Sequence, residues 1–166
     1  MSDDFLQSLG VLALGTRLKR AGGQIQAATQ VWLDARGFPV AATHMPVLAA
    51  LDRYDALPVG TLAAMLGQAQ PGVTRMTTQL EADGWLASRA HEGDGRVRVV
   101  ALTPAGRDLV REAGETLWPH IARAVSGLCQ GLDDGAQDDF AGQLGALEDR
   151  LAAGRFPALL NGEGEA

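Results

Sequence analysis

Hydroxyl and guanidinium groups recur at helical spacing between residues 70 and 84. Thr74, Arg75 and Thr78 fall on one side of a helical wheel turned by about 100° per residue, whereas Val73 and Leu80 fall on the other. No carboxylate interrupts the polar side, so its groups can bond to phosphate oxygens and base edges. This pattern predicts a helix with one packed face and one face suited to duplex DNA.

Local signals mark both ends of that helix. Pro71 fits the first helical turn, where its missing N–H costs nothing, and Gly84 can adopt the left-handed conformation that ends a helix. Gln70 and the backbone amides near Gly72 are expected to add donors to the polar face. A short polar face with one arginine is more often simply solvated, so this helix alone does not identify a DNA reader.

Two strand-like runs follow, at residues 85–89 and 96–102, with a glycine-containing turn between them. They predict a β-hairpin. Arg96 and Arg98 alternate with valines, so both are expected to leave one face of the strand and to reach phosphate or a narrow groove. Asp94 is two residues from Arg96, and we expect it to hold that guanidinium in position.

These residues resemble the MarR family of winged helix-turn-helix regulators. The family's wing signature is matched in identity and spacing by Asp94, Arg96, Leu102, Thr103 and Gly106. The run at residues 71–75 resembles the family's recognition helix, and Leu62, Ala63 and Leu66 resemble the helix before it. The resemblance implies a DNA-binding surface made of Gln70, Pro71, Gly72, Thr74, Arg75, Thr78, Arg96 and Arg98, with Asp94 supporting the wing.

The two ends of the chain have long-helix patterns. Apolar residues recur every three or four positions at Val11, Leu14, Leu18, Ala21, Ile25, Ala28 and Trp32, which predicts one helix over residues 5–36. Thr103 is expected to cap a second helix that starts at Pro104 and is kinked by Pro119. A last helix is expected over residues 134–153, ended by Gly154. The apolar sides of these helices can pack within one chain or against a second copy of it.

The predicted fold class is therefore mainly α with a small β-hairpin wing, in a single domain over residues 1–166. Residues 40–102 form the expected winged helix-turn-helix part, and residues 5–36 and 103–156 form the expected helical dimerisation part. The resemblance implies a homodimeric repressor whose two recognition helices lie about one DNA turn apart on a palindromic operator.

Charge is distributed unevenly along the chain. The net charge is −6, but residues 58–102 contain four arginines and four acidic residues and are neutral. Residues 133–166 contain eight acids and two arginines, which accounts for the whole surplus. A neutral reading module depends on a few well-placed arginines, so we expect modest, salt-sensitive DNA binding by each monomer. The acidic balance keeps open an alternative, a winged-helix module that binds protein instead of DNA.

Other function classes find little support. No catalytic constellation or phosphate-binding glycine loop is present, so no enzyme and no cofactor are predicted. The three histidines are scattered, which argues against a metal site, and Cys129 has no basic neighbour to activate it. One cysteine, no apolar span and no signal sequence favour a cytoplasmic protein without membrane contact.

The resemblance also implies release of DNA by a small aromatic or phenolic effector, which would enter between the helical part and the reading module. Trp32 and His44 are the candidate effector-binding residues, and Met45 and Trp118 are further candidates for the same cleft. For each of them, ordinary core packing is the more common role.

Overall fold

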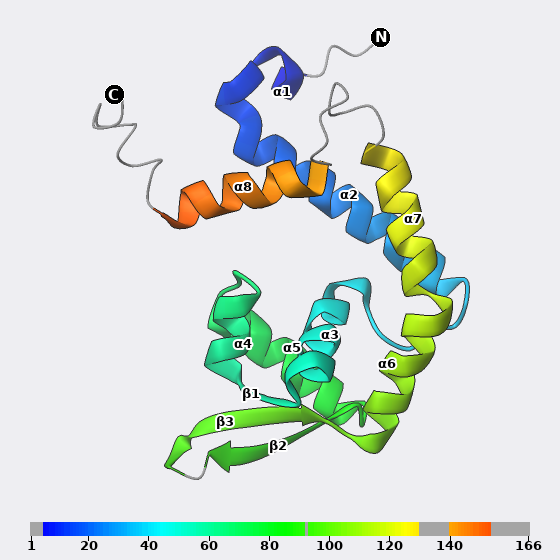
Figure 1. Ribbon diagram of the computed structural model, residues 1–166, viewed down its shortest axis with the longest axis vertical. Coiled ribbons are helices and arrows are strands. Elements are labelled where there is room, and N and C mark those ends of the chain that lie inside the picture. Colours follow the sequence, from blue (N-terminus) through cyan, green and yellow to red (C-terminus); the bar gives the residue numbers. More distant parts are fainter. Residues whose placement is uncertain (1–4, 92, 130–139, 154–166) are drawn as a thin grey trace. The chain divides into compact units, whose positions relative to one another are not determined.

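The structure is a computed structural model that describes residues 5–91, 93–129 and 140–153, and it consists of two compact units that divide between Pro119 and His120. The chain is mainly helical with one small sheet (Figure 1), which confirms the predicted fold class. Within the described residues, no helix is long and apolar enough to cross a membrane. The elements of the first unit are α1 (Phe5–Ser8), η1 (Gly10–Ala13), α2 (Leu14–Asp34), η2 (Ala42–His44), α3 (Met45–Tyr54), β1 (Ala56–Pro58), α4 (Val59–Met65), α5 (Gln70–Ala82), β2 (Leu86–His91), β3 (Asp94–Leu102) and α6 (Pro104–Thr116). Helix α7 (Trp118–Cys129) crosses the division, and α8 (Phe140–Ala152) belongs to the second unit.

The predicted hairpin is present, and it is longer than expected. Strands β2 and β3 pair antiparallel, with Leu86 opposite Leu102 and Arg89 opposite Val99, and the pairing shifts after Ala90. Strand β1 adds to the other edge of β3, which gives the order β1-β3-β2. Sequence patterns did not predict β1, because three residues carry no readable alternation and their pairing is made with a distant strand. We call the β2–β3 hairpin the wing.

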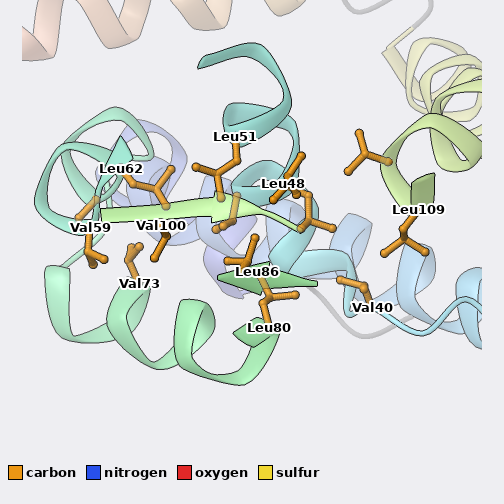
Figure 2. Packing of buried hydrophobic residues seen from close by; sticks show 14 residues of the cluster. Val40, Leu48, Leu51, Val59, Leu62, Val73, Leu80, Leu86, Val100 and Leu109 are labelled. Carbon is orange, nitrogen blue, oxygen red and sulfur yellow. The ribbon is translucent and has the colours of Figure 1, made fainter. Parts of the chain in front are cut away.

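The core lies where α3, α4 and α5 meet the sheet (Figure 2). Leu48 and Leu51 come from α3, Leu62 from α4, Leu80 from α5 and Val100 from β3, and all five are almost fully buried. Burial of aliphatic side chains contributes roughly 1.5–3 kcal/mol each. This shared core packs α5 against the wing, so the two candidate DNA-contacting elements belong to one compact unit.

Helix α5 has the predicted boundaries. It begins at Gln70 with Pro71 in its first turn, and Gly84 follows its end with a φ of 82°. The Gly84 amide donates to Glu81 O at 3.0 Å and the Trp85 amide donates to Leu80 O at 2.9 Å, so the last carbonyls of the helix are satisfied. A side chain at position 84 would be strained in this conformation, which explains the glycine.

The N-terminal helix is not the single element that the apolar pattern predicted. The chain is divided at Leu9–Gly10 into α1, η1 and α2, and Gly10 has a φ of 55°. An α-helix cannot pass through that conformation, so the prediction of one helix over residues 5–36 is wrong for its first third. Helix α2 does continue through Gly22-Gly23.

The helix after the wing starts as predicted and ends earlier. The Thr103 hydroxyl accepts from the Gly106 amide at 3.0 Å, and Pro104 opens the helix. Instead of a kink at Pro119, the structure has a break at Leu117, and Pro119 lies in the first turn of α7. Proline is tolerated in that turn because its missing N–H has no partner there.

Part of the predicted C-terminal region lies outside the described residues. Helix α8 confirms helical structure over 140–152, but the expected start over residues 134–139 and the expected stop at Gly154 are not described. The acidic residues 133–139 and the side chain of Cys129 are also outside the description.

Candidate nucleic-acid interface

Helix α5 presents the predicted polar face. Arg75 and Thr78 are exposed and Thr74 is partly exposed, whereas Val73 and Leu80 on the opposite side are completely buried. The predicted division of the helix into a packed and an open face is therefore correct. Among the described residues, the Arg75 guanidinium has no hydrogen-bond or ion-pair partner, so its donors are available to an external acceptor.

A hollow of about 300 Å³ lies beside this face, where α4, α5 and β3 meet. It brings together four of the predicted site residues. Its lining consists of Pro58, Val59, Gly60, Thr61, Gln70, Thr74, Arg96, Val97 and Arg98. Sequence reasoning missed the contribution of residues 58–61, since a strand end and a short helix with one hydroxyl carry no DNA-binding signal of their own.

The two threonine hydroxyls on the open face of α5 are used differently. Thr74 Oγ1 donates to the Gln70 carbonyl at 2.9 Å, so it presents lone pairs to the outside. Thr78 Oγ1 accepts from Arg98 Nη1 at 3.0 Å, and because a guanidinium has no acceptor, the Thr78 hydroxyl keeps its own proton free to donate. Thr74 is thereby suited to the amino groups of bases, and Thr78 is suited to phosphate or carbonyl oxygens.

The amide of Gly72 is not the free donor that the sequence suggested. It donates to Ala69 O at 2.9 Å, because the chain tightens at the start of α5. A Cβ at position 72 would meet nothing within 4 Å, so this glycine leaves open space next to the helix start. The open space permits close approach of a partner to the backbone.

Asp94 supports the wing through the backbone of Arg96. Its Oδ1 accepts from the Arg96 amide at 3.0 Å, where we expected a bond to the guanidinium. A carboxylate two residues ahead forms this local turn readily, whereas the long arginine side chain extends past it. Within the described part of the chain, the Arg96 guanidinium has no partner, and the residue is exposed.

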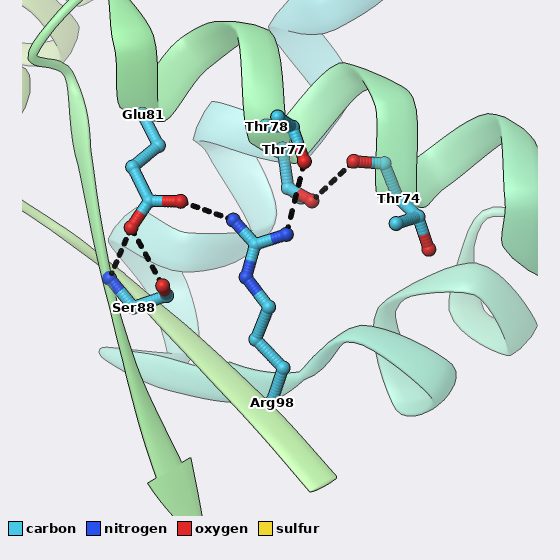
Figure 3. A network of polar contacts seen from close by, with 6 residues as sticks. All are labelled: Thr74, Thr77, Thr78, Glu81, Ser88 and Arg98. Carbon is cyan, nitrogen blue, oxygen red and sulfur yellow. Dashed lines mark hydrogen bonds and ion pairs between the residues drawn. The ribbon is translucent and has the colours of Figure 1, made fainter. Parts of the chain in front are cut away.

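Arg98 behaves differently from Arg96. Its guanidinium forms an ion pair with Glu81 and bonds to Thr78 (Figure 3), although sequence alternation placed both arginines on one free strand face. Glu81 in turn accepts from the Ser88 hydroxyl at 2.6 Å and from the Ser88 amide at 3.1 Å. The bond from the Ser88 hydroxyl, with help from Arg98, lowers the pKa of Glu81 below its ordinary value, so this carboxylate stays charged.

Comparison with known proteins identifies similar families and structures. A family model described as MarR family matches residues 37–97, which include α3, α4, α5 and most of the wing. A crystal structure of a MarR-family transcriptional regulator from Silicibacter pomeroyi is 28% identical and has a TM-score of 0.62, with 89% of this chain and 94% of that chain covered. Residues 37–97 of the chain therefore match the MarR family, and the fold is that of a MarR-family regulator.

Two further MarR-like structures share the fold. A MarR variant from E. coli complexed with operator DNA is 18% identical, with a TM-score of 0.69 and coverage of 90% of this chain and 99% of that chain. Bordetella bronchiseptica BpsR, whose DNA binding is regulated by 6-hydroxynicotinic acid, is 24% identical, with a TM-score of 0.62 and coverage of 84% and 91%. Among curated proteins, a riboflavin kinase from Pyrobaculum arsenaticum is 34% identical over 119 residues, and the chain spans 53% of its length.

The two candidate effector residues lie on α2 and η2. Trp32 is partly buried, and the guanidinium of Arg36 lies 3.7 Å from its ring centroid. His44 is partly buried at the end of η2, where burial lowers the pKa of its imidazole below 6.5 against the opposing effect of Asp83. A bond from the Ala42 amide to Gln30 Oε1 at 2.7 Å joins the two segments. Effector binding by Trp32 and His44 stays a prediction.

Proposed function

We propose that this chain is a sequence-specific, DNA-binding transcriptional regulator of the MarR family. The observation that carries the proposal is the placement of two exposed guanidinium groups without a partner among the described residues. Arg96 lines a hollow with exposed hydroxyl and amide groups, and Arg75 lies on the open face of α5, which contributes Gln70 and Thr74 to that hollow. Exposed cationic donors without internal partners are what duplex phosphate and base edges require.

In the proposed complex, the outer face of α5 enters the major groove and the wing tip reaches the neighbouring minor groove. Arg75 reads a base edge, because its guanidinium can form two parallel bonds to guanine. Thr74, Thr78, Gln70 and the open backbone at Pro71-Gly72 complete this contact surface. Arg96 enters the minor groove, where its charge is favoured by the negative potential between the phosphates.

We further propose that the active form is a homodimer. Large apolar side chains are exposed in the first unit, including Val11 at 84%, Leu12 at 88% and Val31 at 69%. Exposure of several large apolar side chains favours their burial in a protein contact over exposure to solvent. A twofold dimer would present two reading surfaces to a palindromic operator, and the modest affinity of each neutral module would then be multiplied.

The proposed regulator acts in the cytoplasm as a repressor that is released by a small aromatic or phenolic molecule. The regulation of BpsR by 6-hydroxynicotinic acid supports this part of the proposal by analogy within the fold. Trp32 and His44 are the proposed contacts, since an indole can stack on an aromatic ring and an imidazole can bond to a hydroxyl or carboxylate.

A gel-shift experiment tests the proposed function. Duplexes that flank the chain's own coding region are titrated with protein at low salt and at about 200 mM salt, with a random duplex of equal length as competitor. We expect a competitor-resistant complex that weakens as salt rises. Background binding to every duplex, even at low salt, would contradict the proposal and favour the protein-interaction alternative.

Replacement of Arg96 by alanine is expected to weaken binding to operator and random duplexes by similar factors. The contact is largely electrostatic, so the slope of log affinity against log salt should fall by about one. Fluorescence anisotropy at several salt concentrations measures both quantities.

Arg111 offers the matched control for this experiment. It also carries one positive charge, but it lies on α6, is 66% exposed and is paired with Asp108. Arg111→Ala should leave the salt slope unchanged. An unchanged slope in Arg96→Ala would refute the proposed wing contact.

A further inference from the structure

Four polar residues connect the recognition helix to both strands of the wing. Thr78 and Glu81 come from α5, Ser88 from β2 and Arg98 from β3 (Figure 3). We call this set the clasp. We propose that Glu81 and Arg98 are positioning residues, which hold the wing at a fixed angle to α5 and orient the Thr78 hydroxyl toward DNA. This inference rests on the proposed DNA-binding function.

The Glu81 carboxylate accepts three bonds from two residues. One carboxylate oxygen accepts both Ser88 bonds, and the other accepts from Arg98. Because β2 is an edge strand, its outward amide at Ser88 has no strand partner, and Glu81 satisfies it. The carboxylate therefore ties an otherwise unpaired sheet edge to the middle strand and to its own helix.

Arg98 completes the connection, because its guanidinium bonds to two residues of α5. One guanidinium nitrogen bonds to Thr78 and another bonds to Glu81, one helical turn apart. Two bonds in a planar fork define the orientation of β3 relative to α5 far better than one. The same contact requires Thr78 to accept, which leaves its own proton free to donate to another acceptor. Arg98 thus acts on DNA through Thr78 and the wing, not through phosphate.

The direction in which one substitution changes the affinity for DNA distinguishes a positioning role from a purely electrostatic effect. Glu81→Gln removes a negative charge beside the proposed DNA surface, and charge alone predicts tighter binding. If Glu81 positions the wing, the same change should weaken specific operator binding by about tenfold, because the Arg98 contact loses its charged partner. Asp83→Asn is the matched control, since it removes one charge from the end of the same helix but lies outside the clasp.

A variant series tests the proposal by fluorescence anisotropy on a selected operator. The members are Glu81→Gln, Arg98→Met, the double variant Glu81→Gln/Arg98→Met, Arg98→Lys and Asp83→Asn. We expect Arg98→Met to weaken binding by about tenfold or more and the double variant to be no weaker than Arg98→Met, because both changes break one contact. Arg98→Lys keeps the charge but not the fork, so its affinity should remain reduced. Asp83→Asn should match or exceed the wild type.

Two results would overturn the proposal. Glu81→Gln could bind as tightly as Asp83→Asn, in which case Glu81 positions nothing. Alternatively, Arg98→Met could lower the salt slope by about one and Arg98→Lys could restore affinity, in which case Arg98 contacts phosphate directly.

Hydrogen exchange of the Ser88 amide distinguishes failure of the clasp from failure of the proposed function. Its proton is held by Glu81, so exchange in the free protein should accelerate by about tenfold or more in Glu81→Ala, which removes the acceptor, but not in Asp83→Ala. If exchange responds in this way and the wild type binds no duplex, the DNA-binding proposal fails. If the wild type binds its operator and exchange does not respond, the clasp fails.

Discussion

Replacement of Gly106 by alanine is expected to lower the free energy of unfolding by about 3 kcal/mol or more. A Cβ at this position would lie 2.1 Å from the Trp85 carbonyl oxygen and 3.1 Å from its carbon. That carbonyl cannot move aside easily, because it accepts from the Thr103 amide at 3.0 Å and from the Thr103 hydroxyl at 3.2 Å. Chemical denaturation, with circular dichroism as the readout, measures the change.

Gly114 provides the control in the same helix. A Cβ there would lie 3.8 Å from the Trp118 ring, which is ordinary contact. Gly114→Ala should therefore stabilise the chain by about 0.5–1 kcal/mol, the usual gain for alanine over glycine within a helix. Wild-type stability of Gly106→Ala would show that α6 does not pack on the Trp85 carbonyl as described, and would remove the physical reason for this glycine in the wing signature.

Replacement of Arg75 by alanine is expected to weaken operator binding by about 1–3 kcal/mol, with a much smaller effect on random duplexes. Arg75 is exposed near the centre of the open face of α5, so its fork can reach a base edge as the helix enters the major groove. Parallel anisotropy titrations of a selected operator and a random duplex measure the difference between the two losses.

Arg75→Lys sharpens this experiment. Lysine keeps the positive charge but lacks the planar fork. If Arg75 reads a base, Arg75→Lys should therefore bind random duplexes as tightly as the wild type does and still bind the operator more weakly. Equal losses on the two duplexes in Arg75→Ala, recovered on both by lysine, would show that Arg75 only touches phosphate.

Local signals were sufficient for the elements that lie at the candidate interface. Pro71 and Gly84 marked the ends of α5, the three-four spacing separated Val73 and Leu80 from Arg75, and alternation identified the wing. Each of these features is set by backbone conformation or by burial of one face within a few residues of sequence. Thr103 as a cap belongs to the same class, because its partner amide is three residues away.

Features that depend on distant partners were not predictable. Strand alternation placed Arg98 beside Arg96, but the acceptor that engages Arg98 lies seventeen positions earlier in the chain, on another element. Only the tertiary fold brings Glu81 to it. The sequence did hold a weak signal. Glu81, one turn after Thr77 and Thr78, is an acidic residue near the polar face of α5 and could have suggested a partner for a wing arginine. Strand β1 was missed for the same reason.

Backbone conformation also limited the sequence analysis. The apolar seam through Val11 and Leu14 is continuous, yet Gly10 adopts a positive φ that divides the helix. Glycine permits this conformation without requiring it, so the residue type alone did not decide between a helix and a break. The break at Leu117 lies two residues before Pro119, because a proline interrupts a continuous helix but is tolerated in the first turn of a new one.

Selection from a pool of random duplexes tests the central claim, that the α5 face and the wing read DNA sequence, most directly. Wild-type protein is incubated with the pool, and the bound duplexes are recovered and sequenced. We predict enrichment of a palindromic motif with half-sites about one helical turn apart, and loss of preference at one base pair of each half-site when Arg75→Ala replaces the wild type. Recovery of the input pool without any enriched motif would contradict the account.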